Sequence, residues 1–385
     1  MLKQFFKRCV TVGITLLVFT SVFFSQSVQG EEMETSAQSA VLMVADTGAL
    51  LYEKEAHVQR PMASTTKIMT ALLTLEEAER LGDPIVEITK EMVAVEGSSM
   101  GLMPGDQLSL SGLAAGMLLA SGNDAANAAA IYLDGSLESF VDKMNQRAQE
   151  IGMENTHFVT PSGLDGESED GLGHYSTAYD MALLAREALK NQRFRELCSS
   201  SEYAVELLEP IKRVSYTNHN KLLAQYSGCV GVKTGFTKQA GRCLVSAAEK
   251  EGMLLIAVTL NAPDDWNDHT LLLDYGFSQV EAFHLAAGDV NGVVPVVGSE
   301  KESVGFTGAD GPAIALRRDD VKRIVRKVCI PAFLYAPVDL EDKIGEVRWY
   351  LDGELLGSVP ITARESIPAQ SKEPGFWARL FDKDR

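Results

Sequence analysis

The chain has 385 residues, more than one hydrophobic core usually serves, so two folded domains with appendages are expected. Hydrophobic residues make up 45% and charged residues 23% of it, which excludes a disordered or fibrous protein. The formal net charge of -18 argues against nucleic acid as a partner, because its phosphates would be repelled over the whole surface.

Residues 1–30 have the pattern of a secretory signal peptide. Basic residues at Lys3, Lys7 and Arg8 precede an apolar run, and Gly30 places a small residue at a cleavage point. The apolar run, residues 10–24, is shorter than the ~20 residues that span a bilayer, so cleavage is favoured over a retained anchor. We therefore expect an exported protein.

The mature chain opens with a polar tail, residues 31–39. Two apolar runs follow, residues 40–45 and 50–52, which predict a β-hairpin at the edge of a sheet. A helix is then predicted to begin at Ser64 and to end near Gly82. Lys67 follows Ser64 by three residues, so its amine and the serine hydroxyl face the same side of the helix.

A neutral lysine can take the proton of a serine hydroxyl and turn it into a nucleophile, and burial or a second cation favours the neutral amine. The alternative interpretation is a helix-capping Ser64 beside a solvated Lys67. The Ser-x-x-Lys spacing alone does not decide between them.

A second polar motif, Ser121-Gly122-Asn123, lies between two helical runs of small residues, 113–120 and 124–131. Further helices are predicted near residues 137–151 and 177–190. Between these two lies a long loop, residues 155–175, rich in Gly, Ser and acidic residues. Long loops inside compact domains are more often functional than idle.

A third motif, Lys233-Thr234-Gly235, ends an apolar run that predicts a strand. Two more strands are predicted at residues 243–248 and 253–260, and a closing helix at residues 268–275. Strands at both ends of a helical middle predict a mixed α/β (α+β) domain: one sheet with helices on both faces and a helical lobe. The active site is expected where the lobes meet.

In this order, the three motifs form the signature set of penicillin-recognising serine enzymes. The chain closely resembles the serine-type D-alanyl-D-alanine carboxypeptidases, the low-molecular-mass penicillin-binding proteins, densely over roughly residues 40–280. Further stretches that carry the resemblance are residues 44–48, 121–128, 155–158, 161–165, 174–180 and 272–277. It implies a β-lactamase/transpeptidase-like catalytic domain at the outer face of the cytoplasmic membrane, with no metal or cofactor.

The resemblance also implies the catalytic roles. Ser64 attacks the carbonyl between two D-alanines of a peptidoglycan stem peptide and becomes acylated, as it also does with β-lactam antibiotics. Lys67 accepts the Ser64 proton, a task that contributes about 10²- to 10⁴-fold to a rate. Ser121 bridges Lys67 and Lys233 and passes a proton to the departing D-alanine.

The substrate-binding roles follow in the same way. Asn123 holds the acyl-side amide, while Lys233 and Thr234 receive the terminal carboxylate. Gly235 lies on an edge strand that pairs with the extended substrate. The backbone N–H groups of Ser64 and Phe236 form the oxyanion hole.

One departure from the family concerns the substrate carboxylate. Some relatives carry an arginine just after the strand that ends near Leu260, whereas this chain has an acidic stretch, residues 263–268, at that place. Carboxylate binding then depends more on Lys233 and Thr234, and Arg242 is a candidate substitute.

Other functions share these residues. A β-lactamase would need a carboxylate that activates water, for which Glu167 and Glu169 are the candidates. A D,D-endopeptidase uses the same residues, and a non-catalytic penicillin sensor would acylate and stall. A histidine-based triad is disfavoured because no Gly-x-Ser-x-Gly is present, so the six histidines are interpreted as packing or surface residues.

The domains are therefore predicted as a signal peptide (residues 1–30), a catalytic domain (31–280), a small all-β domain (281–367) and a tail (368–385). Asp352-Gly353 marks a hairpin turn in the β domain. The tail carries Phe376, Trp377, Leu380 and Phe381 on one helical face, either as a short amphipathic membrane anchor or as a frayed end.

Four cysteines remain after residue 30: Cys198, Cys229, Cys243 and Cys329. Their spacings match no zinc pattern. Cys229 and Cys243 flank the Lys-Thr-Gly turn on neighbouring strands, either as a disulfide or as packed free thiols.

Overall fold

The computed structural model describes residues 33–168 and 171–370. The predicted signal peptide and all but the first residues of the predicted tail lie outside these ranges. Within the described part of the chain, no helix is both long and apolar enough to cross a membrane.

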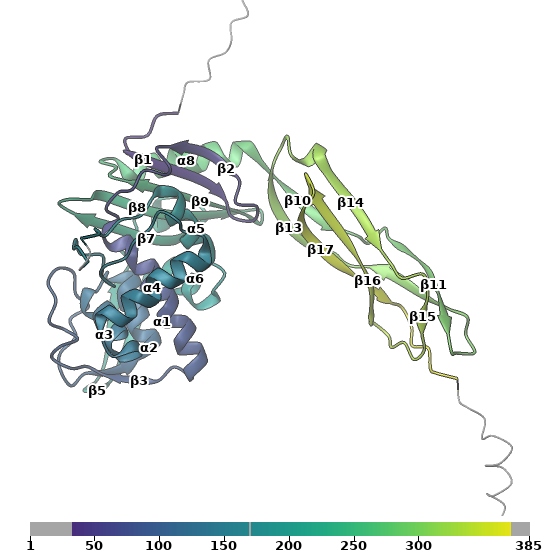
Figure 1. The fold of residues 1–385 in the computed structure, drawn as a ribbon, viewed down its shortest axis with the longest axis horizontal. Coiled ribbons are helices and arrows are strands. Elements are labelled where there is room, and N and C mark those ends of the chain that lie inside the picture. The colour runs from purple at the N-terminus through teal and green to yellow at the C-terminus, as the bar shows by residue number, and fades with distance from the viewer. Residues whose placement is uncertain (1–32, 169–170, 371–385) are drawn as a thin grey trace, which may run out of the picture. The chain divides into compact units, whose positions relative to one another are not determined.

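A five-stranded antiparallel sheet forms the centre of the catalytic region, in the order β2-β1-β9-β8-β7 (Figure 1). Its strands are β1 (Ser39–Val44), β2 (Leu50–Lys54), β7 (Cys229–Thr237), β8 (Gly241–Lys250) and β9 (Met253–Leu260). The predicted edge hairpin and the three later strands are confirmed. Strand β7, which carries the Lys-Thr-Gly motif, is the opposite edge of this sheet, so one side of its backbone is free to pair.

Helices cover both faces of the sheet. Figure 1 shows α8 on one face and α5 on the other, and each packs on β9. The helices are α1 (Lys67–Leu81), α2 (Leu110–Leu119), α3 (Asn123–Asp134), α4 (Leu137–Ile151), α5 (Ala178–Ala188), α6 (Gln192–Ser199), α7 (Leu222–Gln225) and α8 (Asp265–Gln279). The predicted helices are confirmed within a few residues, whereas α6 and α7 were not predicted.

Helix α2 lies at the centre of the helical lobe. All of its residues except Ser111 are buried, because small and apolar side chains surround its axis. It packs against α1 and α3, which carry Lys67 and Asn123. The helical lobe therefore positions two of the three motifs from one common core.

A small four-stranded sheet completes the lobe, in the order β3-β4-β5-β6. Its strands are β3 (Ile85–Glu87), β4 (Gln107–Ser109), β5 (Glu202–Glu209) and β6 (Ile211–Thr217). The hairpin of β5 and β6 is absent from the sequence prediction. Both strands are largely exposed, so they lack the continuous apolar run that marks a buried strand.

The C-terminal region is all β, as predicted. A six-stranded sheet, β14-β16-β17-β12-β11-β15, and a two-stranded sheet, β10-β13, enclose a second apolar core. The strands are β10 (Val280–Ala286), β11 (Asn291–Val297), β12 (Ser303–Gly308), β13 (Asp310–Arg317), β14 (Ile324–Cys329), β15 (Leu334–Tyr335), β16 (Lys343–Leu351) and β17 (Glu354–Ala363). The Asp352-Gly353 turn joins β16 to β17, with Gly353 at a positive φ of 93°.

The four described cysteines are free thiols. In the ladder of β7 and β8, Cys229 pairs with Ala248 while Cys243 pairs with Gly235. The two cysteines thus lie at opposite ends of the strand pair, and the register excludes a disulfide between them.

Candidate active site

Ser64 lies in a single 3₁₀ turn, Ala63–Thr66, that leads directly into α1. The sequence places Ser64 at a helix start, and the structure refines this position to the turn before the helix. Ala63 has a φ of 50°, a left-handed conformation that costs a non-glycine residue about 1–3 kcal/mol. The turn presents the Ser64 side chain half-buried, and Ser64 caps no helix.

Lys67 is the first residue of α1 and is completely buried. Its Nζ lies 3.0 Å from Oγ of Ser64, 2.6 Å from Oδ1 of Asn123 and 2.5 Å from the backbone oxygen of Ser162. Burial lowers the pKa of Lys67 well below its usual value, and the nearby charge of Lys233 lowers it further.

A neutral amine has two N–H groups and one lone pair. Asn123 and Ser162 offer only acceptor oxygens to Lys67, so they take both N–H groups. In a neutral Lys67 the lone pair would then remain for the Ser64 hydroxyl, whose Oγ lies 3.0 Å from Nζ. This arrangement matches a general base that is ready to accept the serine proton.

Ser121 lies just before α3, with a φ of 58°. Its Oγ is 3.1 Å from Nζ of Lys233, which also donates to the backbone oxygen of Thr234 at 2.9 Å. The hydrogen bonds of the described residues therefore join Ser121 to Lys233, and none of them joins it to Lys67. Lys233 is buried, and burial lowers its pKa to about 7.

Asn123 positions Lys67. Its Oδ1 accepts from Lys67, and its Nδ2 donates to the backbone oxygen of Glu96 at 2.6 Å. The next residue, Asp124, is buried and accepts hydrogen bonds from the backbone N–H groups of Met100, Gly101 and Leu102. The start of α3 thus fixes both the lysine and the loop that passes beside it.

Strand β7 lies against the turn that carries Ser64. A side-chain carbon at Gly235 would lie 3.1 Å from the backbone nitrogen of Ser64 and 3.0 Å from that of Thr65, so any larger residue would have to push the turn and the strand apart by a few tenths of an ångström. Phe236 follows on the same edge strand, and its side chain is 66% exposed. The close approach brings the backbone of β7 beside the Ser64 amide.

The predicted long loop contributes to the site through its backbone and through one histidine. The backbone oxygen of Ser162 accepts from Lys67. Nε2 of His174 lies 2.7 Å from Oγ1 of Thr66, and its Nδ1 accepts from the backbone N–H of Val159. Burial lowers the pKa of His174 to about 3, so a neutral imidazole links the loop to the 3₁₀ turn.

A cavity of about 280 Å³ opens beside Ser64. It also contains Thr234, Gly235 and Phe236 from β7, together with Ser121. Three further residues that line the cavity belong to none of the three motifs: Ser98, His219 and Trp266. No local sequence pattern singles these three out, because they come together only in the folded chain.

Arg242 and Asp265 line the same cavity. Nη2 of Arg242 donates to Asp265 at 2.6 Å, and the guanidinium lies 5.6 Å from the ring centre of Trp266. Nε of Arg242 is buried and has no hydrogen-bond partner among the described residues. Asp265 belongs to the acidic stretch, residues 263–268, that stands where some relatives carry an arginine. This stretch therefore holds Arg242 at the cavity.

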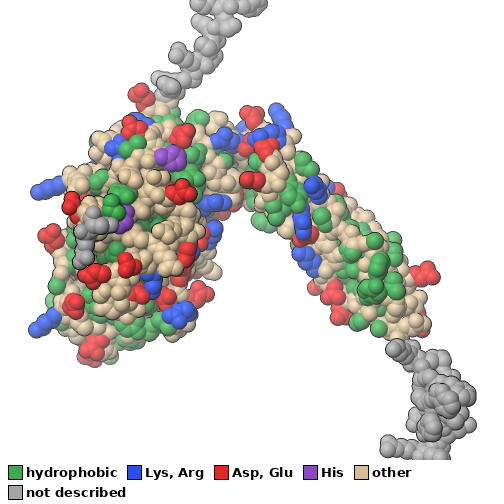
Figure 2. Space-filling view, in the orientation of Figure 1, with side chains coloured by type: hydrophobic (Ala, Val, Ile, Leu, Met, Phe, Trp, Pro, Cys, Tyr) green, Lys and Arg blue, Asp and Glu red, His purple; other side chains and the backbone are tan. Residues whose placement is uncertain are grey.

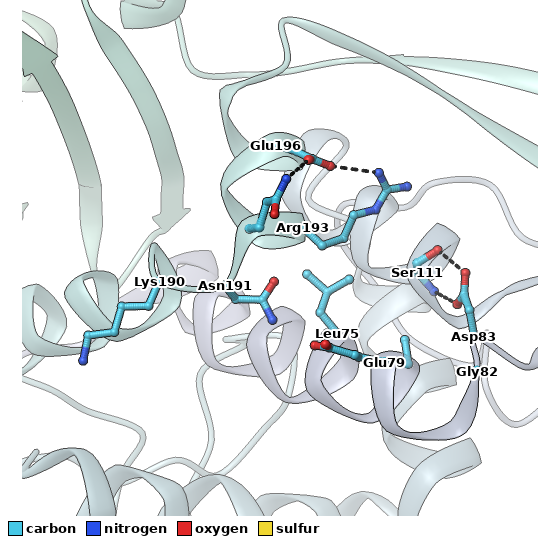
Figure 3. Close-up of a pocket in the computed structure, with 11 residues that line it drawn as sticks. Leu75, Glu79, Gly82, Asp83, Ser111, Lys190, Asn191, Arg193 and Glu196 are labelled. Atoms are coloured by element: carbon cyan, nitrogen blue, oxygen red, sulfur yellow. Dashed lines mark hydrogen bonds and ion pairs between the residues drawn. The ribbon is translucent and has the colours of Figure 1, made fainter. Parts of the chain in front are cut away.

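A larger cavity lies elsewhere among the described residues. Figure 3 shows this space of about 740 Å³, which is lined by residues of α1, the start of α2 and α6 and contains no motif residue. Four of its polar side chains pair with one another, Ser111 with Asp83 and Arg193 with Glu196. It offers no reactive group comparable to the Ser64 cavity.

Of the two carboxylates in the β-lactamase alternative, the structure describes one. Glu167 is exposed and is not among the described residues that line the Ser64 cavity, while Glu169 lies outside the described ranges. His269 is buried between Ser246 and Thr259, which confirms a packing role. The described residues hold no His, Cys, Asp and Glu group suited to a metal ion.

The five-stranded sheet, the helical lobe and the buried serine–lysine pair define a serine hydrolase of the β-lactamase/transpeptidase class. Among solved structures, penicillin binding protein 5 from Haemophilus influenzae is similar, with a TM-score of 0.62 and 28% identity over 87% of this chain and 98% of that chain. The DD-transpeptidase of Streptomyces K15 is similar over 64% of this chain and 98% of that chain, with a TM-score of 0.59 and 34% identity.

The sequence comparisons narrow the class. The family model of D-alanyl-D-alanine carboxypeptidases matches residues 25–264, and that of the penicillin-binding protein 5 C-terminal domain matches residues 282–369. The D-alanyl-D-alanine carboxypeptidase DacF of Bacillus subtilis is 34% identical over 95% of this chain and 94% of its own length. The Escherichia coli enzyme DacC is 31% identical over 95% of this chain and 92% of its own length. The chain belongs to the D-alanyl-D-alanine carboxypeptidase family of serine peptidases.

Proposed function

We propose that this chain removes the terminal D-alanine from peptidoglycan stem peptides through an acyl-enzyme on Ser64, outside the cytoplasmic membrane. The observation that carries the proposal is the geometry of Lys67. Its Nζ lies within hydrogen-bond distance of two acceptor oxygens, and the Ser64 hydroxyl is 3.0 Å away, so a neutral amine would have its lone pair left for that hydroxyl. The same attack on a β-lactam ring makes the antibiotic a covalent inhibitor.

In acylation, the Ser64 proton moves to Nζ of Lys67 while Oγ bonds to the carbonyl carbon of the penultimate D-alanine. The carbonyl oxygen becomes negative and accepts from the backbone N–H groups of Ser64 and Phe236, each such donor being worth about 10²- to 10³-fold. The C–N bond then breaks. The proton that Lys67 accepted passes through the Ser121 hydroxyl to the departing nitrogen. Water then attacks the ester carbon and breaks its bond to Oγ of Ser64; one water proton returns to Oγ, and the hydroxyl stays on the shortened peptide as its new carboxyl group.

The substrate lies along the free edge of β7 in this proposal, and Asn123 holds its acyl-side amide. The terminal carboxylate is received by Lys233, Thr234 and Arg242. Arg242 is suited to this task because it lines the Ser64 cavity. Among the described residues, its guanidinium donates through Nη2 to Asp265, and the other N–H groups remain for a substrate carboxylate. Arg242 would thus replace the arginine that some relatives carry after β9.

The proposal includes the division of the chain into a cleaved signal peptide (residues 1–30), a catalytic domain (31–280), a β domain (281–367) and a tail (368–385). Two separate apolar cores, one among residues 41–260 and one among residues 285–367, support this division. A secreted chain with this arrangement meets its substrate in the cell envelope.

The experiment measures free D-alanine released by the mature protein from a diacetyl-Lys-D-Ala-D-Ala peptide, with a cross-linked peptide dimer and a β-lactam as parallel substrates. A carboxypeptidase releases D-alanine from the monomer faster than it cleaves the other two. Preferential cleavage of the dimer would identify an endopeptidase, and rapid β-lactam hydrolysis a β-lactamase. Acylation without release of any product would identify a sensor.

A further inference from the structure

One buried histidine lies beside the active site and has no part in the proposed mechanism. In the view of Figure 2, histidine side chains occupy only small areas of the surface. His174 is 5% exposed, and burial lowers its pKa to about 3, with smaller contributions from His157 and Lys67. A neutral and nearly enclosed imidazole has to satisfy both ring nitrogens with fixed partners. The partners of the two nitrogens therefore indicate its role.

The direction of each hydrogen bond of His174 follows from the backbone. The N–H of Val159 donates to Nδ1 at 2.9 Å, so Nδ1 carries no proton. A neutral imidazole then has its N–H at Nε2, which donates to Oγ1 of Thr66 at 2.7 Å. The Thr66 hydroxyl in turn donates to the backbone oxygen of Ala63 at 2.8 Å. The hydrogen bonds thus run in one direction, from the long loop through the ring to the 3₁₀ turn.

This series of hydrogen bonds ends on the residue before the nucleophile. Ala63 is completely buried and has a left-handed φ of 50°, and Ser64 follows it directly. The loop also packs closely against Ala63, because a side-chain carbon at Gly163 would lie 2.1 Å from its backbone oxygen. A conformation that costs free energy persists only where its surroundings fix it. The contacts of the loop and of Thr66 therefore fix the turn that presents Ser64.

The same loop supplies a partner of the general base. The backbone oxygen of Ser162 accepts from Nζ of Lys67 at 2.5 Å. Val159, whose N–H is bound by His174, precedes Ser162 by three residues. His174 thus joins two segments that meet at the reacting atoms: the turn that carries Ser64 and the loop that orients Lys67.

We propose that His174 is a positioning residue for acylation, which sets the placement of Oγ of Ser64 against Nζ of Lys67 by holding the turn and the loop together. The proposal rests on the proposed acyl-enzyme at Ser64, and His174 itself touches no reacting atom in it. Its effect is therefore on the rate constant of acylation and not on binding. A displacement of about 1 Å between reacting groups can lower a rate by about 10²-fold.

The test is single-turnover acylation of the mature full-length protein by a chromogenic β-lactam, measured over a range of β-lactam concentrations. Thr66→Val removes the hydroxyl between His174 and Ala63, and His174→Phe removes both ring nitrogens. We expect the acylation rate constant at saturation to fall about 10²-fold in each, while the half-saturating concentration stays near the wild-type value.

Two conservative variants test the hydrogen bonds themselves. Thr66→Ser keeps the hydroxyl, and His174→Gln keeps an N–H near the position of Nε2. Both should therefore stay within about tenfold of the wild-type rate constant. If they lose as much as Thr66→Val and His174→Phe, the hydrogen bonds do not position the turn and the proposal is wrong.

His269→Phe is the matched control for the loss of a buried histidine. His269 is completely buried, and its two nitrogens also contact hydroxyls, those of Ser246 and Thr259. Calorimetry gives the folded fraction of each variant. Per folded molecule, His269→Phe should acylate as wild type. An equal loss in His269→Phe and His174→Phe would show general destabilisation and would overturn the positioning role.

Nitrogen-15 NMR of the wild-type protein tests the direction of the hydrogen bonds without a variant that has to fold. The His174 signals are assigned by their loss in His174→Gln. We expect Nε2 to be coupled directly to a proton and Nδ1 to show no such coupling, and the opposite tautomer would overturn the proposal. Because acylation by the β-lactam is measured apart from D-alanine release, a protein that acylates without releasing D-alanine would contradict the proposed function and still decide the role of His174.

Discussion

Two buried lysines, Lys67 and Lys233, belong to the active site, and their different surroundings suit them to different roles. Lys67 is surrounded by two acceptors and the serine hydroxyl, and the charge of Lys233 adds to burial in lowering its pKa. Lys233 contacts a hydroxyl and a backbone oxygen, and burial alone lowers its pKa to about 7. In the proposed mechanism, Lys67 is the proton acceptor and Lys233 is the group that keeps a charge for the substrate.

This division predicts the pH dependence of kcat/KM for D-alanine release. At low pH the rate falls because Lys67 becomes protonated and cannot accept the Ser64 proton. As the pH rises above about 7, Lys233 in the free enzyme loses its charge, so carboxylate binding weakens and kcat/KM falls again.

A peptide whose terminal carboxylate is replaced by an amide provides the control. With it, the acidic limb should remain and the alkaline limb should disappear, because no carboxylate needs the Lys233 charge. An identical alkaline limb for both peptides would contradict the assigned role of Lys233.

A second prediction at the residue scale concerns Arg242 and the binding of the substrate carboxylate. Arg242→Gln keeps hydrogen-bonding capacity toward Asp265 but removes the charge at the cavity. We expect kcat/KM for the free-acid peptide to fall about tenfold to a hundredfold, as for loss of one charged hydrogen bond, mainly through KM. The amidated peptide should be little affected. Equal losses for both peptides would mean that Arg242 supports the fold and does not bind the carboxylate.

Among the elements, strand β7 and the 3₁₀ turn approach each other closely at Gly235. Gly235→Ala would place a methyl group against the backbone nitrogens of Ser64 and Thr65. We expect β7 to move away from the turn, which separates the two oxyanion donors and lowers the acylation rate by about 10²- to 10³-fold. Stopped-flow acylation by a chromogenic β-lactam measures the rate.

Gly305→Ala is the matched control, because Gly305 also lies in a strand and a side-chain carbon there meets nothing closer than 3.9 Å. It should acylate as wild type. If Gly235→Ala also acylated as wild type, β7 would not contribute to the oxyanion hole.

The elements also show how far sequence reasoning reaches. The helices with periodic apolar residues, such as α4, and the apolar strand β9 are predicted closely, because their local pattern determines their burial. The short polar helix α6 and the exposed hairpin β5–β6 are missed because tertiary contacts stabilise them. In the same way, motifs locate Ser64 and Lys67, whereas only the fold brings His219 and Trp266 to the cavity.

At the scale of the whole molecule, the described residues form two large apolar cores. Ile256 is completely buried in the first and Ile361 in the second. The motif residues Ser64, Ser121 and Lys233 all belong to the region of the first core. The two cores should therefore differ in their effect on catalysis.

Ile361→Ala is expected to destabilise the C-terminal core by about 2–5 kcal/mol, the usual effect of such a truncation in a core, and to leave D-alanine release per folded molecule unchanged. Ile256→Ala should instead lower the temperature at which activity is lost. Calorimetry combined with residual activity after heating distinguishes the two. Loss of activity in Ile361→Ala at 25 °C would show that catalysis depends on the second core.

The most direct measurement of the central claim is the site of the covalent adduct. Mature wild type and Ser64→Ala are each incubated with benzylpenicillin, digested and analysed by mass spectrometry, and the same two preparations are assayed for D-alanine release. We predict a penicilloyl adduct on Ser64 and D-alanine release in wild type, and neither in Ser64→Ala. An adduct on another residue, or D-alanine release by Ser64→Ala, would contradict an acyl-enzyme mechanism at Ser64.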